Sequence, residues 1–500
     1  MPCVRGGPVS SDVHESPASG AVRLEHDSLG SLPVPAAAYY GAQTARAVRN
    51  FPVSGLRPHP AFVRAMVQIK RAAALANREL GRLPDAVALA IVRAAEEALA
   101  QLPTVPLDPV VVDPQAPGLA DQWVVDPYQA GAGTSHNMNT NEVLANRAIE
   151  LLGGGRGDYR LVHPNDHVNM AQSTNDTVPT AIRLIGLDLG HRLGRTLWRA
   201  ARAFQERADA FDAILKTGRT HLQDAVPIRL GQEFAAYART IERAARRVAQ
   251  AMEALCEIGL GGTAVGTGLN ADPGYPAAVA RHLAAATGHP LRPSSDLRQS
   301  MQSLGDALAL SGACRTAAVD LNKIANDLRL MASGPRTGLG EILLPAVQPG
   351  SSIMPGKVNP VLCEMLNMVC YQVLGHDLTI ATAAEAGQLE LNVMMPVVAH
   401  NLAWMLTILD GGVAAFSERC VAGIRADAER CRYWLERSAA LSTALAPRIG
   451  YEAAAALTKE MLESGRGIAE LAVERGLLTA DELETLLDPE AMTSPGVPGS

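Results

Sequence analysis

Aromatic side chains are scarce in this chain, and their scarcity limits how its core can be built. Only 4% of the 500 residues are aromatic, whereas 48% are hydrophobic, so aliphatic residues and abundant alanine supply most of the apolar surface. Small side chains favour helices and let neighbouring helices approach closely. A chain of this length can bury a large core and is expected to fold as two or three domains. The composition therefore predicts a mostly α-helical protein made of long, packed helices.

The cysteines lack the spacing of a metal site or a disulfide framework. Seven cysteines are scattered along the sequence, and none forms a Cys-x-x-Cys pair. An odd, scattered set is typical of reduced thiols, which favours a cytoplasmic protein. No apolar segment follows a basic start at the N-terminus, so we expect no signal peptide.

Neither a membrane nor a nucleic acid is an expected partner. One uncharged stretch, residues 391–409, approaches the length of a membrane span, but it contains two Asn, one Pro and one His. A buried helix of a bundle fits this stretch better. The net charge of −7 argues against nucleic acid binding. That charge suits an enzyme acting on small anions if the binding site itself is locally basic.

The chain divides into four parts by composition and pattern. Residues 1–21 are rich in Gly, Pro and Ser and are expected to form a disordered extension. Residues 22–172 are expected to form an N-terminal domain, which five prolines between positions 103 and 117 interrupt with an irregular insertion. Residues 173–430 are expected to form a central domain of long helices, and residues 431–500 a small C-terminal helical domain.

Helical periodicity is strongest in the middle of the chain. Apolar residues recur at steps of three and four over residues 182–204 and again over residues 230–255. A third helix is expected over residues 304–331, where it ends before a Gly-Pro pair, and two more over residues 360–422. Helices of this length exceed the usual size in globular proteins, and their apolar stripes need partners. The pattern predicts an elongated bundle that assembles with other bundles.

Two polar clusters precede expected helices. Residues 129–139 combine glycines, which expose backbone N–H groups, with polar side chains, although such a run also suits a solvated turn. Residues 163–176 end in Ser, Thr and Asn before a long helix, where one of the three would suffice as a cap and where an anion is favoured. His163 and His167 are spaced like metal ligands, but Pro164 opposes a regular helix there, so we expect no metal site. The candidate binding residues are Thr134, Ser173, Thr174 and Asn175.

A third cluster contains an imidazole. Residues 218–225 place Thr220 and His221 together, and we expect this run at the edge of a helix. Gln223 and Asp224 are available to orient the imidazole. A single histidine is usually structural, but the polar neighbours of this one favour a functional role.

A glycine-led loop carries the densest set of functional groups. Residues 350–360 read Gly-Ser-Ser-Ile-Met-Pro-Gly-Lys-Val-Asn-Pro, so polar side chains lie between a flexible glycine and rigid prolines. Hydroxyls, a cation and free backbone N–H groups can bind a carboxylate and stabilise charge that develops on it. A plain Ser/Gly turn is the alternative, and it does not account for so many different groups. The candidate residues are Ser351, Ser352, Lys357 and Asn359.

This loop resembles the Gly-Ser-Ser-x-Met-Pro-x-Lys-x-Asn-Pro pattern of the fumarase/aspartase superfamily. The other three clusters match the superfamily in order and spacing, and the resemblance covers about residues 22–495. It implies a mostly α-helical, three-domain subunit with a long central helix bundle. It also implies a homotetramer in which each active site combines clusters from three subunits.

The resemblance also implies roles for single residues. Ser351 would be the catalytic base, acting as its alkoxide, His221 would belong to the catalytic site, and Glu364 would orient His221. The residues implied to surround the substrate are Thr174 and Ser352 at the reacting carboxylate, Thr220, Lys357 and Asn359 at the other carboxylate, and Thr134, Ser173, Asn175 and His221 at the amino group. No organic cofactor is implied, and a divalent cation would be an activator rather than a reactant.

Within the superfamily, the local sequence favours the aspartate ammonia-lyases. Ala132 and His167 stand where fumarases tend to have Ser and Asp, and residues 384–390 are similar to aspartate ammonia-lyases. Met395 departs from their pattern, because they tend to carry Glu there. The implied reaction is the reversible anti-elimination of ammonia from L-aspartate, a small dicarboxylate, to give fumarate. A class II fumarate hydratase and a non-catalytic superfamily member are the alternatives.

Overall fold

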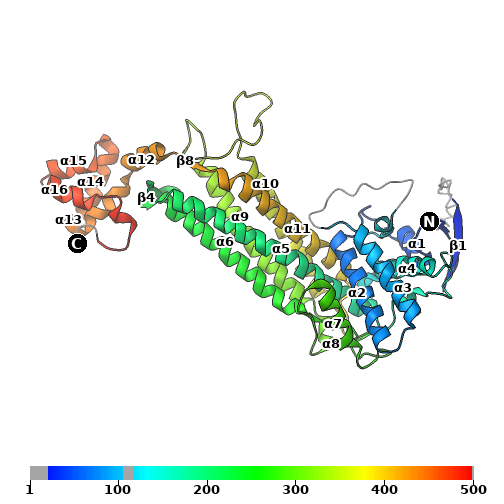
Figure 1. Ribbon diagram of the computed structural model, residues 1–500. Coiled ribbons are helices and arrows are strands. Elements are labelled where there is room, and N and C mark those ends of the chain that lie inside the picture. Colours follow the sequence, from blue (N-terminus) through cyan, green and yellow to red (C-terminus); the bar gives the residue numbers. More distant parts are fainter. Residues whose placement is uncertain (1–20, 105–117, 498–500) are drawn as a thin grey trace, which may run out of the picture.

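The computed structural model describes residues 21–104 and 118–497 and has an elongated, mostly α-helical shape (Figure 1). The predicted fold class is confirmed. The predicted disordered extension at residues 1–21 lies outside the described residues except for its last residue. Most of the predicted insertion at residues 103–117 lies outside them as well.

A β-hairpin and four helices form the N-terminal end of the subunit (Figure 1). The two strands pair antiparallel, with Val22 opposite Pro35 and Asp27 opposite Gly30. Apolar side chains of the second, third and fourth helices pack together in one core. These elements are β1 (Val22–Asp27), β2 (Gly30–Pro35), α1 (Ala42–Asn50), α2 (Pro60–Glu79), α3 (Asp85–Gln101) and α4 (Thr134–Leu151).

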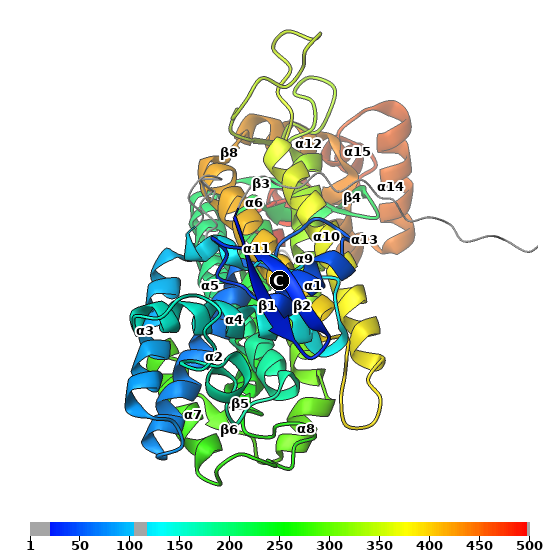
Figure 2. The same ribbon diagram turned by 90° about the vertical axis from the view of Figure 1, so that its right-hand side faces the viewer.

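Five long helices form the central bundle, which is the long body in Figure 1 and is seen from its N-terminal end in Figure 2. The first helix packs against the second and the fifth, and the fourth packs against the third and the fifth. The apolar residues that set the predicted periods at 182–204 and 230–255 are buried in its core. The five helices are α5 (Thr174–Ala210), α6 (Leu230–Glu253), α9 (Gly305–Met331), α10 (Val361–Glu385) and α11 (Met395–Arg419).

Two glycines let α5 and α6 approach closely. A Cβ atom at Gly190 would meet the sulfur of Met252 in α6, and one at Gly186 would lie 2.6 Å from a methyl carbon of Leu255 in the turn directly after α6. Because the interior is already close-packed, larger residues at these positions would require the facing side chains to move. The small residues therefore fix the spacing of the two helices along the bundle.

Short paired strands and two smaller helices connect the long helices. A β-hairpin joins α5 to α6, and the other two strand pairs tie loops at the bundle ends. These elements are β3 (Leu215–Thr220), β4 (Gln223–Arg229), β5 (Glu257–Ile258), α7 (Tyr275–Thr287), β6 (Arg292–Pro293), α8 (Leu297–Gln302), β7 (Ile342–Leu343) and β8 (Arg425–Ala426).

Shorter helices with a small core of their own form the C-terminal end. The last of them begins with a capping box, because Thr479 Oγ1 accepts from the Glu482 N–H while the Glu482 carboxylate accepts from the Thr479 N–H. The predicted domain boundaries near residues 172 and 430 stay a prediction. The helices are α12 (Ala428–Arg437), α13 (Ala446–Ile449), α14 (Tyr451–Ser464), α15 (Ile468–Glu474) and α16 (Ala480–Leu486).

Most of helix α11 and the cysteines of the described residues are buried. Residues 395–423, which include α11, are the one stretch of the described chain long and apolar enough to cross a membrane, and most of its apolar part is buried within the subunit. Its neighbours in the bundle are α5 and α10. The six cysteines in the described residues are free and buried.

Candidate active site

The N-terminus of α5 presents the second predicted cluster. Ser173 caps the helix: its Oγ accepts from the Asn175 N–H at 3.2 Å, and its own N–H donates to Asp176 at 2.9 Å. Thr174 is buried, whereas Ser173 and Asn175 are partly exposed. The free N–H groups and the positive dipole end of a 37-residue helix converge here. Such a helix end favours an anion.

The N-terminus of α4 presents the first predicted cluster beside it. Thr134 is the first residue of α4 and is exposed. The turn before it is formed by Ala132 with φ 63° and Gly133 with φ 88°, a left-handed conformation that costs glycine little. Asn137, in the first turn, donates from Nδ2 to Thr174 Oγ1 at 3.1 Å. The structure therefore brings the first two clusters together.

Sequence reasoning missed two buried charged residues beneath this place. The Asp176 carboxylate accepts from the Gly261 and Thr263 N–H groups at 3.1 and 3.0 Å, which holds a loop against α5. Lys70 of α2 is fully buried and donates to two side-chain amide oxygens. Burial raises the pKa of Asp176 to about 6 and lowers the pKa of Lys70 to about 7. A lysine inside the apolar stripe of α2 was the signal that the sequence offered.

The two histidines with metal-like spacing make backbone hydrogen bonds. His163 caps a single helical turn, Pro164–Val168, and His167 lies within this turn, which leads toward α5. His163 Nδ1 accepts from the N–H groups of Asn165 and Asp166 at 3.2 and 3.1 Å. His167 Nδ1 accepts from the His163 N–H at 2.9 Å. Both rings thus shape the turn that precedes the second cluster.

The third cluster lies at the tip of the β3–β4 hairpin, so the prediction of a helix edge is wrong. His221 and Leu222 form the two-residue loop with φ of 56° and 60°, the left-handed geometry that lets two strands reverse before α6 begins. Thr220 and His221 are exposed there. None of the hydrogen bonds among the described residues joins the imidazole to Gln223 or Asp224, so these neighbours do not orient it.

The fourth cluster lies on a segment that projects from the bundle between α9 and α10 (Figures 1 and 2). Ser351 Oγ accepts from the backbone N–H groups of Ile353 and Met354 at 3.3 and 3.0 Å. Asn359 Nδ2 donates to the Gly350 carbonyl at 2.5 Å and closes the loop. The other two candidates on this loop, Ser352 and Lys357, are exposed.

One subunit keeps the four clusters apart. The cluster at Thr174 begins α5, whereas the hairpin that carries His221 follows the far end of this helix. At 1.5 Å per residue, the 37 residues of α5 separate the two ends by about 55 Å. The Ser351 loop lies at the same end of the bundle as the hairpin (Figure 1). Glu364, in the first turn of α10, makes no hydrogen bond to His221 within the described part of the chain. A single subunit therefore cannot bring all four clusters to one substrate.

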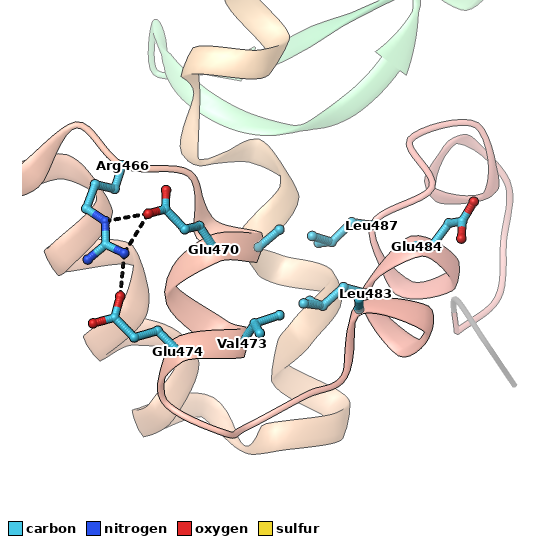
Figure 3. Close-up of a pocket in the computed structure, with 9 residues that line it drawn as sticks. Arg466, Glu470, Val473, Glu474, Leu483, Glu484 and Leu487 are labelled. Atoms are coloured by element: carbon cyan, nitrogen blue, oxygen red, sulfur yellow. Dashed lines mark hydrogen bonds and ion pairs between the residues drawn. The ribbon is translucent and has the colours of Figure 1, made fainter.

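A surface groove near the C-terminus does not have the chemistry of the predicted site (Figure 3). It lies along α15 and α16 and has a volume of about 750 Å³. Arg466 pairs with Glu470 at 2.6 Å and also with Glu474, so its charge is neutralised within the wall. Leu483 and Leu487 contribute apolar lining. No residue of the four clusters lines this groove.

Comparison with known protein families agrees with the motifs. A family described as lyase matches residues 30–375, and a family described as the fumarase C C-terminus matches residues 441–494. The chain belongs to the lyase family of the fumarase/aspartase superfamily. It is an enzyme of the lyase class, as the loop at residues 350–360 predicted.

Individual relatives match over nearly the whole chain. An aspartate ammonia-lyase of Bacillus sp is 49% identical over 478 residues, which cover 96% of this chain and 99% of that protein. A class II fumarate hydratase of Thermosynechococcus vestitus is 45% identical over 471 residues, which cover 94% and 97%. The crystal structure of a Brucella melitensis protein called fumarate lyase:delta crystallin, bound to cobalt, is 47% identical. It superposes with a TM-score of 0.88 and covers 95% of this chain and 100% of that chain.

Proposed function

We propose that this enzyme converts L-aspartate reversibly to fumarate and ammonia by anti-elimination, with Ser351 as the base. The choice of substrate rests on the aspartate ammonia-lyase relative at 49% identity over 96% of the chain. The choice of base rests on one observation, the pair of backbone N–H groups that point at Ser351 Oγ. The reaction needs no organic cofactor, and a divalent cation acts at most as an activator.

The chemistry requires stabilisation of a new negative charge. The proton that is removed lies next to a carboxylate and is very weakly acidic, and its removal makes an enediolate with a second negative charge. Donors that are already aimed at the developing charge lower this barrier most. The N–H groups of Ile353 and Met354 stabilise Ser351 as an alkoxide in the same way. A serine can therefore act as the base at this position.

The remaining residues hold the substrate by its polar groups. The helix ends at Thr134 and Thr174 offer donors and positive dipoles to a carboxylate. The lysine of the loop adds a full positive charge. In the proposed complex, Thr174 and Ser352 bind the reacting carboxylate, Thr220, Lys357 and Asn359 bind the other one, and Thr134, Ser173, Asn175 and His221 surround the amino group, with Glu364 orienting His221.

The separation of the clusters supports a homotetramer with shared active sites. Since the two ends of α5 lie about 55 Å apart and the hairpin that carries His221 follows the far end, we propose that the hairpin and the Ser351 loop at the site come from other copies. The outer face of α10 supports the same assembly, because it exposes apolar side chains at helical spacing. Their exposed fractions are 64% for Met368, 57% for Tyr371, 37% for Leu374 and 69% for Leu378. Pairing with other bundles would bury this stripe.

Absorbance in the fumarate band tests the substrate. Purified enzyme is given L-aspartate and, separately, L-malate, and the rise in absorbance is compared with that of the Ser351→Ala variant as the blank. We expect rapid formation of fumarate from L-aspartate, matching release of ammonia, and negligible turnover of malate. Faster turnover of malate than of aspartate would contradict the proposal.

Class II fumarate hydratase activity is the second candidate. The relative from Thermosynechococcus vestitus, at 45% identity over 94% of the chain, favours it. The malate measurement above decides between the two. A failure of both substrates with correctly folded protein would leave the non-catalytic alternative.

A further inference from the structure

Lys70 is a fully buried lysine beneath the N-terminus of α5. Its Nζ donates to Asn169 Oδ1 and to Gln172 Oε1, both at 2.9 Å. Among the described residues no carboxylate lies within ion-pair distance of it, and Asp176 of α5 is the one ionisable neighbour that acts on it electrostatically. A buried charge without an ion pair is costly, which suggests that it serves a purpose other than stability.

The hydrogen bonds that start at Lys70 have a defined direction. Lys70 Nζ donates to two oxygens, which both the ammonium group and the neutral amine can do, so Asn169 turns its oxygen toward Lys70 and its nitrogen away. Asn169 Nδ2 accordingly donates to the backbone carbonyl of Gln172 at 3.2 Å. Because Asn169 Oδ1 faces Asn137 at 3.2 Å, Asn137 must present its nitrogen there. The amide orientations of both asparagines are thus set by the lysine.

The chain of directed hydrogen bonds from Lys70 extends to Thr174 in the candidate site. The same nitrogen, Asn137 Nδ2, donates to Thr174 Oγ1 at 3.1 Å. Thr174 therefore accepts from inside the protein, and its hydroxyl hydrogen has no acceptor among the described residues. That hydrogen remains available for a carboxylate bound at the end of α5. An Asn137 turned the other way would take the hydrogen itself.

We propose that Lys70 is a positioning residue that acts through Asn169 and Asn137 to keep the Thr174 hydroxyl donating toward the substrate carboxylate. This role rests on the proposed function, in which Thr174 binds the reacting carboxylate. Without the ammonium group, Asn169 can turn over and Asn137 can follow. The Thr174 hydroxyl then donates inward and presents lone pairs to a negatively charged group.

A double-mutant cycle separates this role from simple packing. Lys70→Met keeps the length of the side chain and removes the donor, and Thr174→Val removes the hydroxyl. Each single variant should raise the Kd of succinate, a non-reacting dicarboxylate, on the order of tenfold, since each loses one hydrogen bond to a charged group. The double variant should bind succinate about as weakly as Thr174→Val alone, because Lys70 acts only through Thr174.

Asn77 provides the matched control on the same helix. Its Nδ2 donates to the Met170 carbonyl at 3.1 Å, so it ties α2 to the same loop without belonging to the directed chain. Asn77→Leu should lower the Tm while leaving the Kd of succinate and the kcat with L-aspartate within about twofold of wild type. A tenfold loss of succinate binding in Asn77→Leu would show that general loosening of the loop suffices, and would overturn the role of Lys70.

A second variant covers the case in which Lys70→Met does not fold. Asn137→Asp replaces the donating nitrogen with an acceptor and leaves Lys70 in place, so the Thr174 hydroxyl is drawn inward. Succinate binding should weaken as much as in Thr174→Val, and wild-type binding would overturn the proposal. The proposal would also be overturned if the double variant of Lys70→Met and Thr174→Val raised the Kd of succinate by the product of the two single increases. Because succinate binding needs no turnover, inactivity toward L-aspartate would contradict the proposed function and leave this test intact.

Discussion

The guanidinium of Arg219 donates to the fully buried carboxylate of Glu341 at 2.7 Å. Arg219 lies directly before the hairpin tip that carries His221, and Glu341 lies on the segment that leads to the Ser351 loop. Lys216, at the base of the same hairpin, lies 3.1 Å from the other oxygen of Glu341. One buried carboxylate thus joins two strand positions of the hairpin to the root of the loop.

Replacing this carboxylate should cost much more stability than replacing an exposed one. Glu341→Gln leaves the Arg219 guanidinium without its carboxylate, while Lys216 keeps its pair with Glu233 at 2.9 Å, and breaking a buried pair typically costs about 3–5 kcal/mol. Glu96→Gln is the matched control, because the pair Arg71–Glu96 is exposed and should contribute less than about 1 kcal/mol. Urea unfolding at one fixed protein concentration measures both. Equal effects of the two variants would contradict the assignment of Glu341 as the buried anchor.

Local periodicity predicted the helices of the bundle well. The helix expected over residues 304–331 is observed at Gly305–Met331, since a clear apolar stripe ends before a Gly-Pro pair. The hairpin was missed because His221 and Leu222 adopt a left-handed backbone without the Asn-Gly type of sequence that signals such turns. Periodicity describes only the side chains along a single helix. The role of Lys70 was not predicted because its hydrogen-bond partners lie about a hundred residues away in the sequence, on the loop before α5.

The sequence allowed the motifs of the candidate site to be predicted, but not their positions relative to one another in the folded subunit. Motif order identified the superfamily, and the family comparison agrees. Nothing in the spacing of the motifs says that α5 puts about 55 Å between Thr174 and the helix end that the hairpin of His221 follows. That distance depends on the helix running unbroken for 37 residues, which only the structure gives. The composition of the complete site therefore stays a prediction.

Ser351→Ala should affect turnover and leave binding nearly unchanged. The variant removes the proposed base but keeps the proposed contacts of Lys357 and Asn359 with a carboxylate. We expect kcat with L-aspartate to fall on the order of a thousandfold or more, while the Kd of succinate changes little. Steady-state kinetics and equilibrium binding measure the two quantities. A near-normal kcat would place the base elsewhere, with His221 as the first candidate.

Lys357→Ala should show the opposite pattern. In the proposed complex its ammonium group contacts a carboxylate in the ground state and in the transition state alike, so its loss should weaken binding by roughly 2–4 kcal/mol. The increase in the Kd of succinate should account for most of the loss in kcat/KM. A variant that binds succinate normally but turns over slowly would contradict this role for Lys357.

Two inactive variants should restore activity when they are combined. If Ser351 and His221 of one site come from different chains, a mixed tetramer of Ser351→Ala and His221→Ala contains some sites with both residues intact. Random assembly would leave about a quarter of the sites intact. Co-expression with two different tags, followed by purification on both, isolates mixed tetramers for assay. Complete inactivity of the mixed tetramers would show that both residues come from one chain.

Mild acid should destabilise the N-terminal helices through His59 and His136. Burial lowers the pKa of each imidazole to about 4, below the usual 6.5. Protonation therefore favours the unfolded chain, so stability is fully present above pH 6.5 and is lost as the pH falls toward 4. His59 Nδ1 also accepts the Ala61 N–H at 3.1 Å as the cap of α2, and a proton on Nδ1 would remove this bond.

His59→Asn tests this acid sensitivity because asparagine can cap the helix and does not titrate. Wild type should lose on the order of 2 kcal/mol per buried histidine between pH 7 and pH 5, and the variant should lose correspondingly less. Its stability at pH 7 should be somewhat lower, since His59 packs edge-on against Trp404 with ring centroids 5.0 Å apart. Urea midpoints at the two pH values give the comparison, with the exposed His26→Asn as the control. At neutral pH both proteins have a helix cap at position 59, and only wild type has a titrating ring there. If His59→Asn loses as much stability in acid as wild type does, the acid sensitivity belongs to other groups.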